Sequence, residues 1–122
     1  MNVAVTQPVP VNGLDESKWA NFHTLRKTAA SLAQIAAEDM TFQPLDNDYL
    51  TYIEDVVHAC FLYRKNVNEI EDFVLDVSSD PISDGSFVGQ VYVRFGIKFD
   101  KKYTNGISCF HYSKLTITVT SL

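Results

Sequence analysis

Two pairs of side chains have the chemistry of metal ligands. His58 and Cys60 are separated by one residue, and so are Cys109 and His111. Four such ligands would suit Zn²⁺. However, His58 and Cys60 fall within a helical pattern, and residues two apart on a helix point about 200° away from each other. This spacing argues against a shared metal ion, and we expect neither a metal site nor a cofactor.

The short motifs of nucleophilic and nucleotide-binding enzymes are absent. Neither cysteine has a histidine in a catalytic signature, and no GxSxG or P-loop pattern occurs. Carboxylate clusters such as Glu69, Glu71 and Asp72 are more often solvated than paired for acid–base work. We therefore expect no catalytic residues and a protein that is not an enzyme. A small-molecule or enzymatic domain would use the space between helices and sheet, which is a third interpretation.

Aromatic and basic residues alternate near the C-terminus, where they have the clearest binding potential. Bases stack on rings and cations neutralise phosphates, so such a mixture on an open sheet face can hold single-stranded nucleic acid. The same residues can form cross-strand pairs beneath a neighbouring subunit, or lie in solvent. The face is defined by Tyr92, Arg94, Lys98, Phe110, Tyr112 and Lys114.

Charge is unevenly distributed and favours a protein partner for this face. The net charge is −5. Residues 1–86 carry five basic and fourteen acidic side chains, whereas residues 87–122 carry five basic and one acidic. An acidic body repels a polyanion at long range. We therefore expect copies of the chain, and possibly other subunits of a particle, as partners, with nucleic acid as the alternative.

Length and composition predict one domain. The chain has 122 residues, of which 46 % are hydrophobic, and a chain of this size buries enough surface for a single core. Cys60 and Cys109 are too few and too far apart for a disulfide framework.

No apolar run reaches the roughly 18 residues of a membrane span, and the start lacks a signal-peptide layout. We expect a virion or cytoplasmic location, without membrane contact or secretion.

Residues 1–13 are predicted to form an extended arm ahead of a single domain at 14–122. Pro8 and Pro10 cannot donate to a β-ladder, which excludes a central strand. The alternating valines favour packing onto a neighbouring subunit, by adding a strand or filling a groove. The predicted arm contacts are Val3, Val5, Val9 and Val11.

Two helices follow in the pattern. Asp15 is a good N-cap for a helix running to about Met40, and Asp46 or Asn47 can cap a second one at roughly 48–65. Asn66 is a plausible residue to follow its C-terminus. The apolar positions of the first helix recur at spacings of 3, 4 and 7 and are Trp19, Phe22, Ala29, Leu32, Ala33, Ala36 and Met40.

The remaining elements are strands. Phe73, Leu75 and Val77 alternate with polar residues, as in a half-buried strand. Apolar residues occupy every odd position in 87–99, and 107–121 forms the last strand.

The register of this C-terminal hairpin follows from hydrophobic matching. If Phe99 lies opposite Ile107, then Ile97 meets Cys109, Val91 meets Leu115, and odd positions face one another throughout. The same register sets Arg94 opposite Tyr112 and Tyr92 opposite Lys114. A tight turn at Asn105-Gly106 would pair odd with even positions, so the longer loop is preferred.

These elements predict an α+β fold, with two helices packed on one face of an antiparallel sheet that contains a long C-terminal β-hairpin. The layout is similar to that of small virion proteins of tailed phages, with an extended arm, a helical pair and a sheet whose final strand runs to the last residue. Contractile-tail sheath subunits and tail-terminator or connector proteins have comparable endings, so the likeness is one of layout over the C-terminal half. The resemblance implies a structural role and carries over no site residues. We expect a self-associating protein in which the basic hairpin meets another copy's acidic body head to tail.

Overall fold

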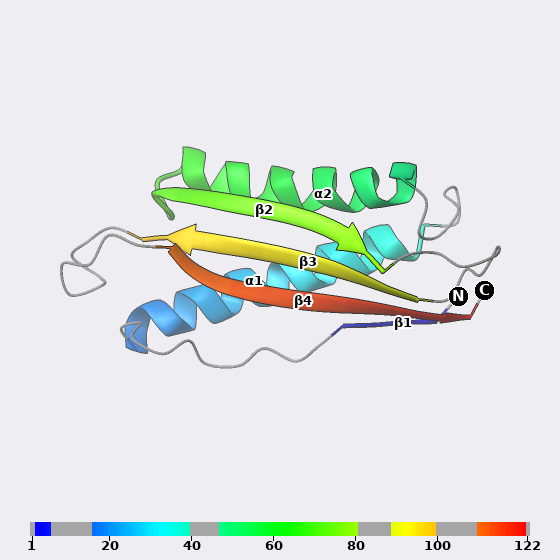
Figure 1. Cartoon of the computed structure of the whole chain (residues 1–122). Coiled ribbons are helices and arrows are strands. Elements are labelled where there is room, and N and C mark those ends of the chain that lie inside the picture. Colours follow the sequence, from blue (N-terminus) through cyan, green and yellow to red (C-terminus); the bar gives the residue numbers. More distant parts are fainter. Residues whose placement is uncertain (1, 6–15, 40–46, 81–88, 100–109, 122) are drawn as a thin grey trace.

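The computed structural model describes residues 2–5, 16–39, 47–80, 89–99 and 110–121, with side chains described for 21–39, 47–80, 89–99 and 110–119. The element order is β1 (Asn2–Val5), α1 (Glu16–Ala37), α2 (Asn47–Asn66), β2 (Asp72–Ser79), β3 (Gly89–Lys98) and β4 (Phe110–Ser121). The four strands form one sheet in the order β1-β4-β3-β2, and every neighbouring pair is antiparallel. Both helices cover the same face of this sheet (Figure 1). The predicted α+β class and the C-terminal hairpin are confirmed.

Helix α1 buries a stripe of small residues beneath the sheet. Ala29, Ala33 and Ala36 are completely or almost completely buried, and small side chains let neighbouring elements approach closely. The helix ends at Ala37, before the predicted Met40, which lies outside the described residues. The buried Tyr49 hydroxyl of α2 donates a 2.8 Å hydrogen bond to the Ala37 carbonyl, which satisfies one of the carbonyls left unpaired at a helix end.

Helix α2 ends in a Schellman motif. Asn68 has a positive φ of 63°, and its amide donates to the Lys65 carbonyl at 3.0 Å. The Glu69 amide donates to the Arg64 carbonyl at 2.9 Å, the other bond of the motif. The prediction that Asn66 follows the helix was therefore wrong by two residues: Asn66 is the last helical residue, and Asn68 takes the left-handed conformation.

The core lies between the helices and the odd-numbered residues of the strands. Phe95 of β3 contacts Phe22 of α1 and Phe61 of α2, with ring centroids 6.1 and 5.1 Å apart. The strand residues that are fully or almost fully buried are Val91, Val93, Phe95, Ile97, Leu115, Ile117 and Val119. The assignment of odd positions to the helical face is therefore confirmed, and the even positions lie on the opposite face.

The predicted register of the hairpin was wrong by two residues. Ile97 lies opposite His111, and Val91 lies opposite Ile117. Arg94 faces Lys114, and Tyr92 faces Thr116. A slip of two residues leaves every side chain on its original face, so hydrophobic alternation alone cannot distinguish the two registers. Cys109 lies outside the described residues.

The beginning of the predicted arm belongs to the chain's own sheet. Residues 2–5 form an edge strand in which Val3 is registered with Val119 and Val5 with Ile117. This differs from the expectation that these valines meet a neighbouring subunit, because β4 offers them a ladder within the same chain. Val9 and Val11 lie outside the described residues.

Neither α1 nor α2 is long and apolar enough to cross a membrane.

Candidate functional site: the open face of the sheet

The sheet face turned away from the helices carries all six residues predicted for binding, and we call it the open face. In Figure 1 the strands lie in front of both helices, so the viewer looks onto this face. Because alternate residues of a strand point to opposite faces, β3 contributes Tyr92, Arg94 and Lys98, and β4 contributes Phe110, Tyr112 and Lys114.

Strand β2 adds residues that the sequence analysis did not assign to this face. Asp72, Val74, Asp76 and Ser78 lie opposite Lys98, Gly96, Arg94 and Tyr92 of β3. The signal that could have found them is the same period of two, since their neighbours Phe73, Leu75 and Val77 pack against the core. The open face thus has an acidic edge on β2 beside its aromatic and basic centre.

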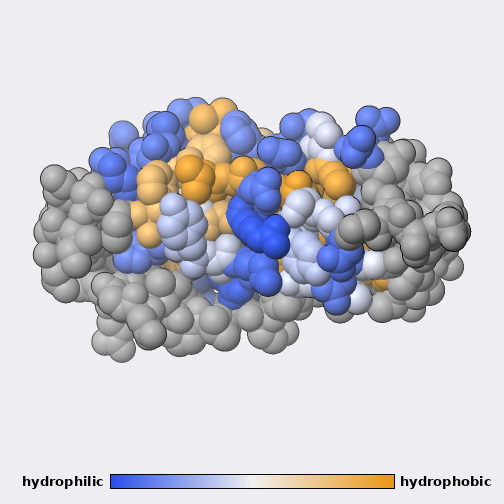
Figure 2. Space-filling view, viewed as in Figure 1, coloured by the Kyte–Doolittle hydropathy of each residue, from blue (hydrophilic) through white to orange (hydrophobic). Residues whose placement is uncertain are grey.

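An apolar row crosses the middle of the open face. Val74, Gly96 and Tyr112 are registered across β2, β3 and β4. Val74 is 43 % exposed and Tyr112 is 67 % exposed. Figure 2 shows hydrophobic and strongly hydrophilic surface interleaved on this side of the molecule. An exposed apolar strip rimmed by charged residues is typical of a protein contact.

Two cationic side chains lie over the ring of Tyr92. The guanidinium carbon of Arg94 lies 5.0 Å from the ring centroid, and the Lys114 ammonium lies 5.4 Å from it. Both distances are within the range of cation–π attraction. The Tyr92 hydroxyl lies 3.0 Å from each carboxylate oxygen of Asp80 and donates to it. This hydrogen bond raises the pKa of Tyr92.

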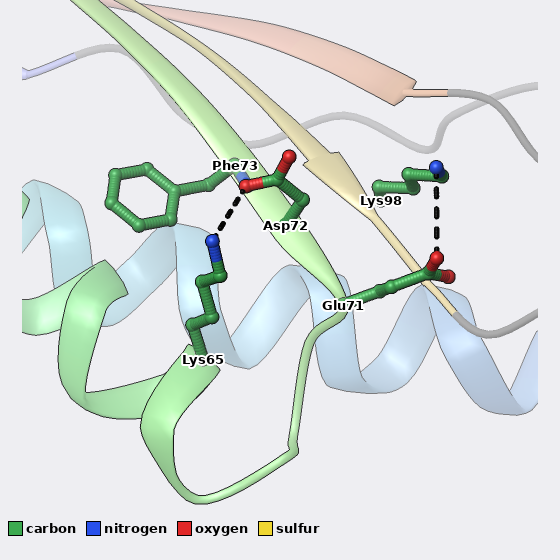
Figure 3. A network of polar contacts seen from close by, with 5 residues as sticks. All are labelled: Lys65, Glu71, Asp72, Phe73 and Lys98. Carbon is green, nitrogen blue, oxygen red and sulfur yellow. Dashed lines mark hydrogen bonds and ion pairs between the residues drawn. The ribbon is translucent and has the colours of Figure 1, made fainter.

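Most cations of the open face already have acidic or polar partners. Arg94 Nη1 donates to Ser78 Oγ at 2.8 Å and lies 3.8 Å from Asp76 Oδ2. Lys98 Nζ lies 3.6 Å from a carboxylate oxygen of Glu71, just before β2 (Figure 3). By contrast, Lys114 has no ion-pair partner in the part of the chain that the structure describes.

Helix α2 supplies an ion-pair partner to the acidic edge of the open face. Lys65 Nζ lies 3.2 Å from Asp72 Oδ1, and the Phe73 amide donates to the same oxygen at 2.9 Å (Figure 3). The amide hydrogen bond, followed by the lysine, lowers the pKa of Asp72. The carboxylate is therefore ionised over the physiological pH range. Asp76, further along the edge, has a side chain that is 69 % exposed.

Two basic side chains lie buried beneath β4. Arg26 of α1 is 4 % exposed and donates from Nη2 to the Lys114 carbonyl at 3.0 Å. Its Nε and Nη1 have no hydrogen-bond partner among the described residues, and burial lowers its pKa. His111 is 8 % exposed and lies on the helical side, with its ring centroid 6.2 Å from that of Phe99. Burial lowers the pKa of His111.

The residues considered as metal ligands are not brought together on α2. His58 is exposed and packs edge-on against Phe73, with centroids 5.2 Å apart. Cys60 is partly buried, and desolvation raises the pKa of its thiol. No group of three His, Cys, Asp or Glu side chains suited to a metal ion occurs within the described ranges.

A cavity of about 460 Å³ opens at the end of the domain where α1 begins and α2 ends. Its charged lining residues, Arg64 and Glu69, form an ion pair of 2.7 Å with each other. Their charges are thus directed at one another, and the cavity presents no unpaired charge to a ligand. The full lining is Asn21, Thr24, Leu25, Arg64, Asn68, Glu69, Ile70 and Phe99.

Comparison with known proteins identifies no relative. No family model matches the sequence, and no curated protein and no solved structure is significantly similar to it.

Proposed function

We propose that this protein is a non-enzymatic assembly subunit that associates with copies of itself through the open face. The observation that carries the proposal is the apolar row in which the exposed side chains of Val74 and Tyr112 flank the buried Gly96, bordered on both sides by charged residues. Contacts between proteins combine such an apolar centre with a polar rim. By the likeness in layout, the setting we propose is a phage particle, as a tail or connector subunit.

Single-stranded nucleic acid is the alternative occupant of the open face. Tyr92, flanked by Arg94 and Lys114, has the composition of a base-stacking site. The acidic edge weighs against it, because Asp76 and Glu71 already neutralise Arg94 and Lys98. A polyanion would have to displace those carboxylates and approach a chain of net charge −5.

Light scattering over a range of protein concentrations tests self-association directly. We expect the average mass to rise with concentration, and Tyr112→Ala to reduce the rise. The matched control is Tyr63→Ala, which removes a similarly exposed tyrosine (63 %) from α2 and should change nothing.

Fluorescence anisotropy with a labelled oligonucleotide separates the two occupants. We expect negligible binding, and a triple substitution of Arg94, Lys98 and Lys114 to Ser should then affect only self-association. Oligonucleotide binding at micromolar concentration by a strictly monomeric protein, weakened by the triple substitution and by salt, would overturn the proposal in favour of nucleic acid.

A further inference from the structure

We infer that the open face binds the open face of a second copy, around a two-fold axis that runs parallel to the strands above β3. This inference rests on the proposed function, since it specifies the partner and symmetry of the proposed contact. It differs from the head-to-tail contact expected from the sequence, in which the basic hairpin meets an acidic body.

Charge on the open face is arranged in columns that follow the strands. The β2 column carries Asp72 and Asp76, whereas the β4 column carries Lys114 beside Phe110 and Tyr112. A two-fold axis across the strands would stack β2 on β2 and bring like charges together. An axis along β3 stacks β2 on β4 of the second copy, so the acidic column covers the basic and aromatic one.

The rows match as well as the columns. Asp76 and Lys114 lie in one row, on either side of Arg94. Rotation about an axis parallel to the strands keeps each row at its own height, so Asp76 of one copy faces Lys114 of the other, twice in the dimer. This pairing gives Lys114 an acidic partner in addition to its contact with the Tyr92 ring. In the next row, Val74 covers Tyr112 of the second copy.

The residues on the axis permit this approach. Gly96 adds no side chain of its own, and the space above it is filled by the Tyr112 ring, so the two copies would meet there through their Tyr112 and Val74 side chains. Lys98 would meet its own copy on the axis, beside its Glu71 partner 3.6 Å away. Arg94 would also meet its own copy, but it is bonded to Ser78 at 2.8 Å and lies 3.8 Å from Asp76, both on β2. These contacts draw the guanidinium away from the axis and neutralise its charge.

The size of the face predicts a weak dimer. Three strands about 4.8 Å apart, with roughly 3.3 Å per residue over the ten residues of β3, present an area of roughly 480 Å² per copy. About twice that area in the dimer lies at the low end of specific interfaces. We therefore expect association that depends on concentration and weakens with salt.

Charge reversal in separate variants tests the symmetry. Asp76→Lys alone and Lys114→Glu alone should each weaken self-association roughly tenfold, because each change makes two attractive contacts repulsive. An equimolar mixture of the two variants should regain most of the lost association, since both contacts between unlike copies then join opposite charges; recovery stays incomplete because Asp76→Lys removes one partner of Arg94. Sedimentation velocity measures the association of each variant and of their mixture, and denaturation confirms that each variant is folded. If Asp76→Lys is unfolded, Asp76→Asn replaces it, with a smaller loss expected.

Matched controls carry the same charge changes outside the face. Asp55→Lys on α2 and Lys27→Glu on α1 alter exposed helical residues and should leave association unchanged, alone and mixed. If Lys114→Glu weakens association but Asp76→Lys leaves it unchanged or strengthens it, the partner is an acidic surface elsewhere on the chain, and the two-fold contact is wrong. If the unsubstituted protein is monomeric at every concentration, the proposed function fails as well.

Discussion

The ring of Tyr112 lies over Gly96 of the neighbouring strand, in the space that any other residue would fill with its β-carbon. A β-carbon at position 96 would be 2.7 Å from Tyr112 Cε1 and 3.1 Å from Val74 Cγ2. Real β-carbons do not approach other atoms at 2.7 Å, so the ring occupies its place only because the residue beneath it is glycine. Two strands are thereby joined at the centre of the open face.

This relationship predicts a non-additive pair of substitutions. Gly96→Ala displaces the Tyr112 ring, which is 67 % exposed and can rotate away, so the unfolding free energy should change by less than about 1 kcal/mol. In a Tyr112→Ala background the contact at 2.7 Å is gone, and only the exposed Val74 side chain, whose Cγ2 would be 3.1 Å away, has to shift slightly. Gly96→Ala should then stabilise by roughly 0.5–1 kcal/mol, because glycine weakens strand interiors. Urea denaturation of the four proteins provides the comparison. An identical effect of Gly96→Ala in both backgrounds would show that the ring does not occupy this space.

Tyr49 should make the protein sensitive to alkali. Burial, followed by the charge of Glu38, raises the pKa of Tyr49 to about 12 from an ordinary value of 10.0. A phenol whose pKa is raised by folding stabilises the folded state fully below pH 10, and that contribution disappears as the pH rises towards 12. We expect the unfolding free energy to fall more steeply over this range than it does in Tyr49→Phe. Parallel profiles for the two proteins would contradict a buried, hydrogen-bonded phenol.

His111 should make the protein less stable at acidic pH. Burial lowers its pKa below the ordinary 6.5, so folding favours the neutral imidazole. That contribution to stability is present above about pH 6.5 and is lost as the pH falls below it. Between about pH 7.5 and about pH 5.5, stability should fall more in the unsubstituted protein than in His111→Phe, which keeps a ring but cannot titrate. Equal losses would place His111 in water.

Strand β1 provides a test of where the first residues belong. Deleting Asn2–Val5 removes its ladder with β4, and each lost hydrogen bond costs about 0.5–1.5 kcal/mol net. The unfolding free energy should therefore fall by about 2 kcal/mol or more. Full stability with lost self-association would instead show that these residues pack on a neighbouring copy, as the sequence led us to expect.

Much of the fold was accessible from the sequence, because period 3.6 and period 2 are strong signals in this chain. The two helices, the buried odd face of Val91, Val93, Phe95 and Ile97, and the six residues of the open face all followed from periodicity. The hairpin register did not, since a slip of two residues conserves every face. It depends on local contacts such as that of Tyr112 with Gly96, which no pattern of hydrophobicity records.

The acidic edge of the open face also escaped the sequence analysis. Asp72 and Asp76 alternate with core residues, but their neighbours across the sheet depend on which strand pairs with β3. Likewise, Asn68 could not be distinguished from Asn66 as the left-handed residue after α2, because both are asparagines near the end of the helical pattern. The errors in the hairpin register and at Asn68 concern positions along a strand or helix, and the missed acidic edge concerns which strands are neighbours. In each case the pattern of residue types is the same for both alternatives, and tertiary contacts determine the structure.

The proposed function makes the open face the surface through which copies of this chain associate. An NMR dilution series of the ¹⁵N-labelled protein tests it most directly, since amide shifts report each residue separately. On dilution, we expect the amides of Val74, Gly96 and Tyr112 to move together along one binding curve, while those of Asp55 and Tyr63 on α2 stay fixed. Shifts confined to the helical surface, or none at any concentration, would contradict the claim.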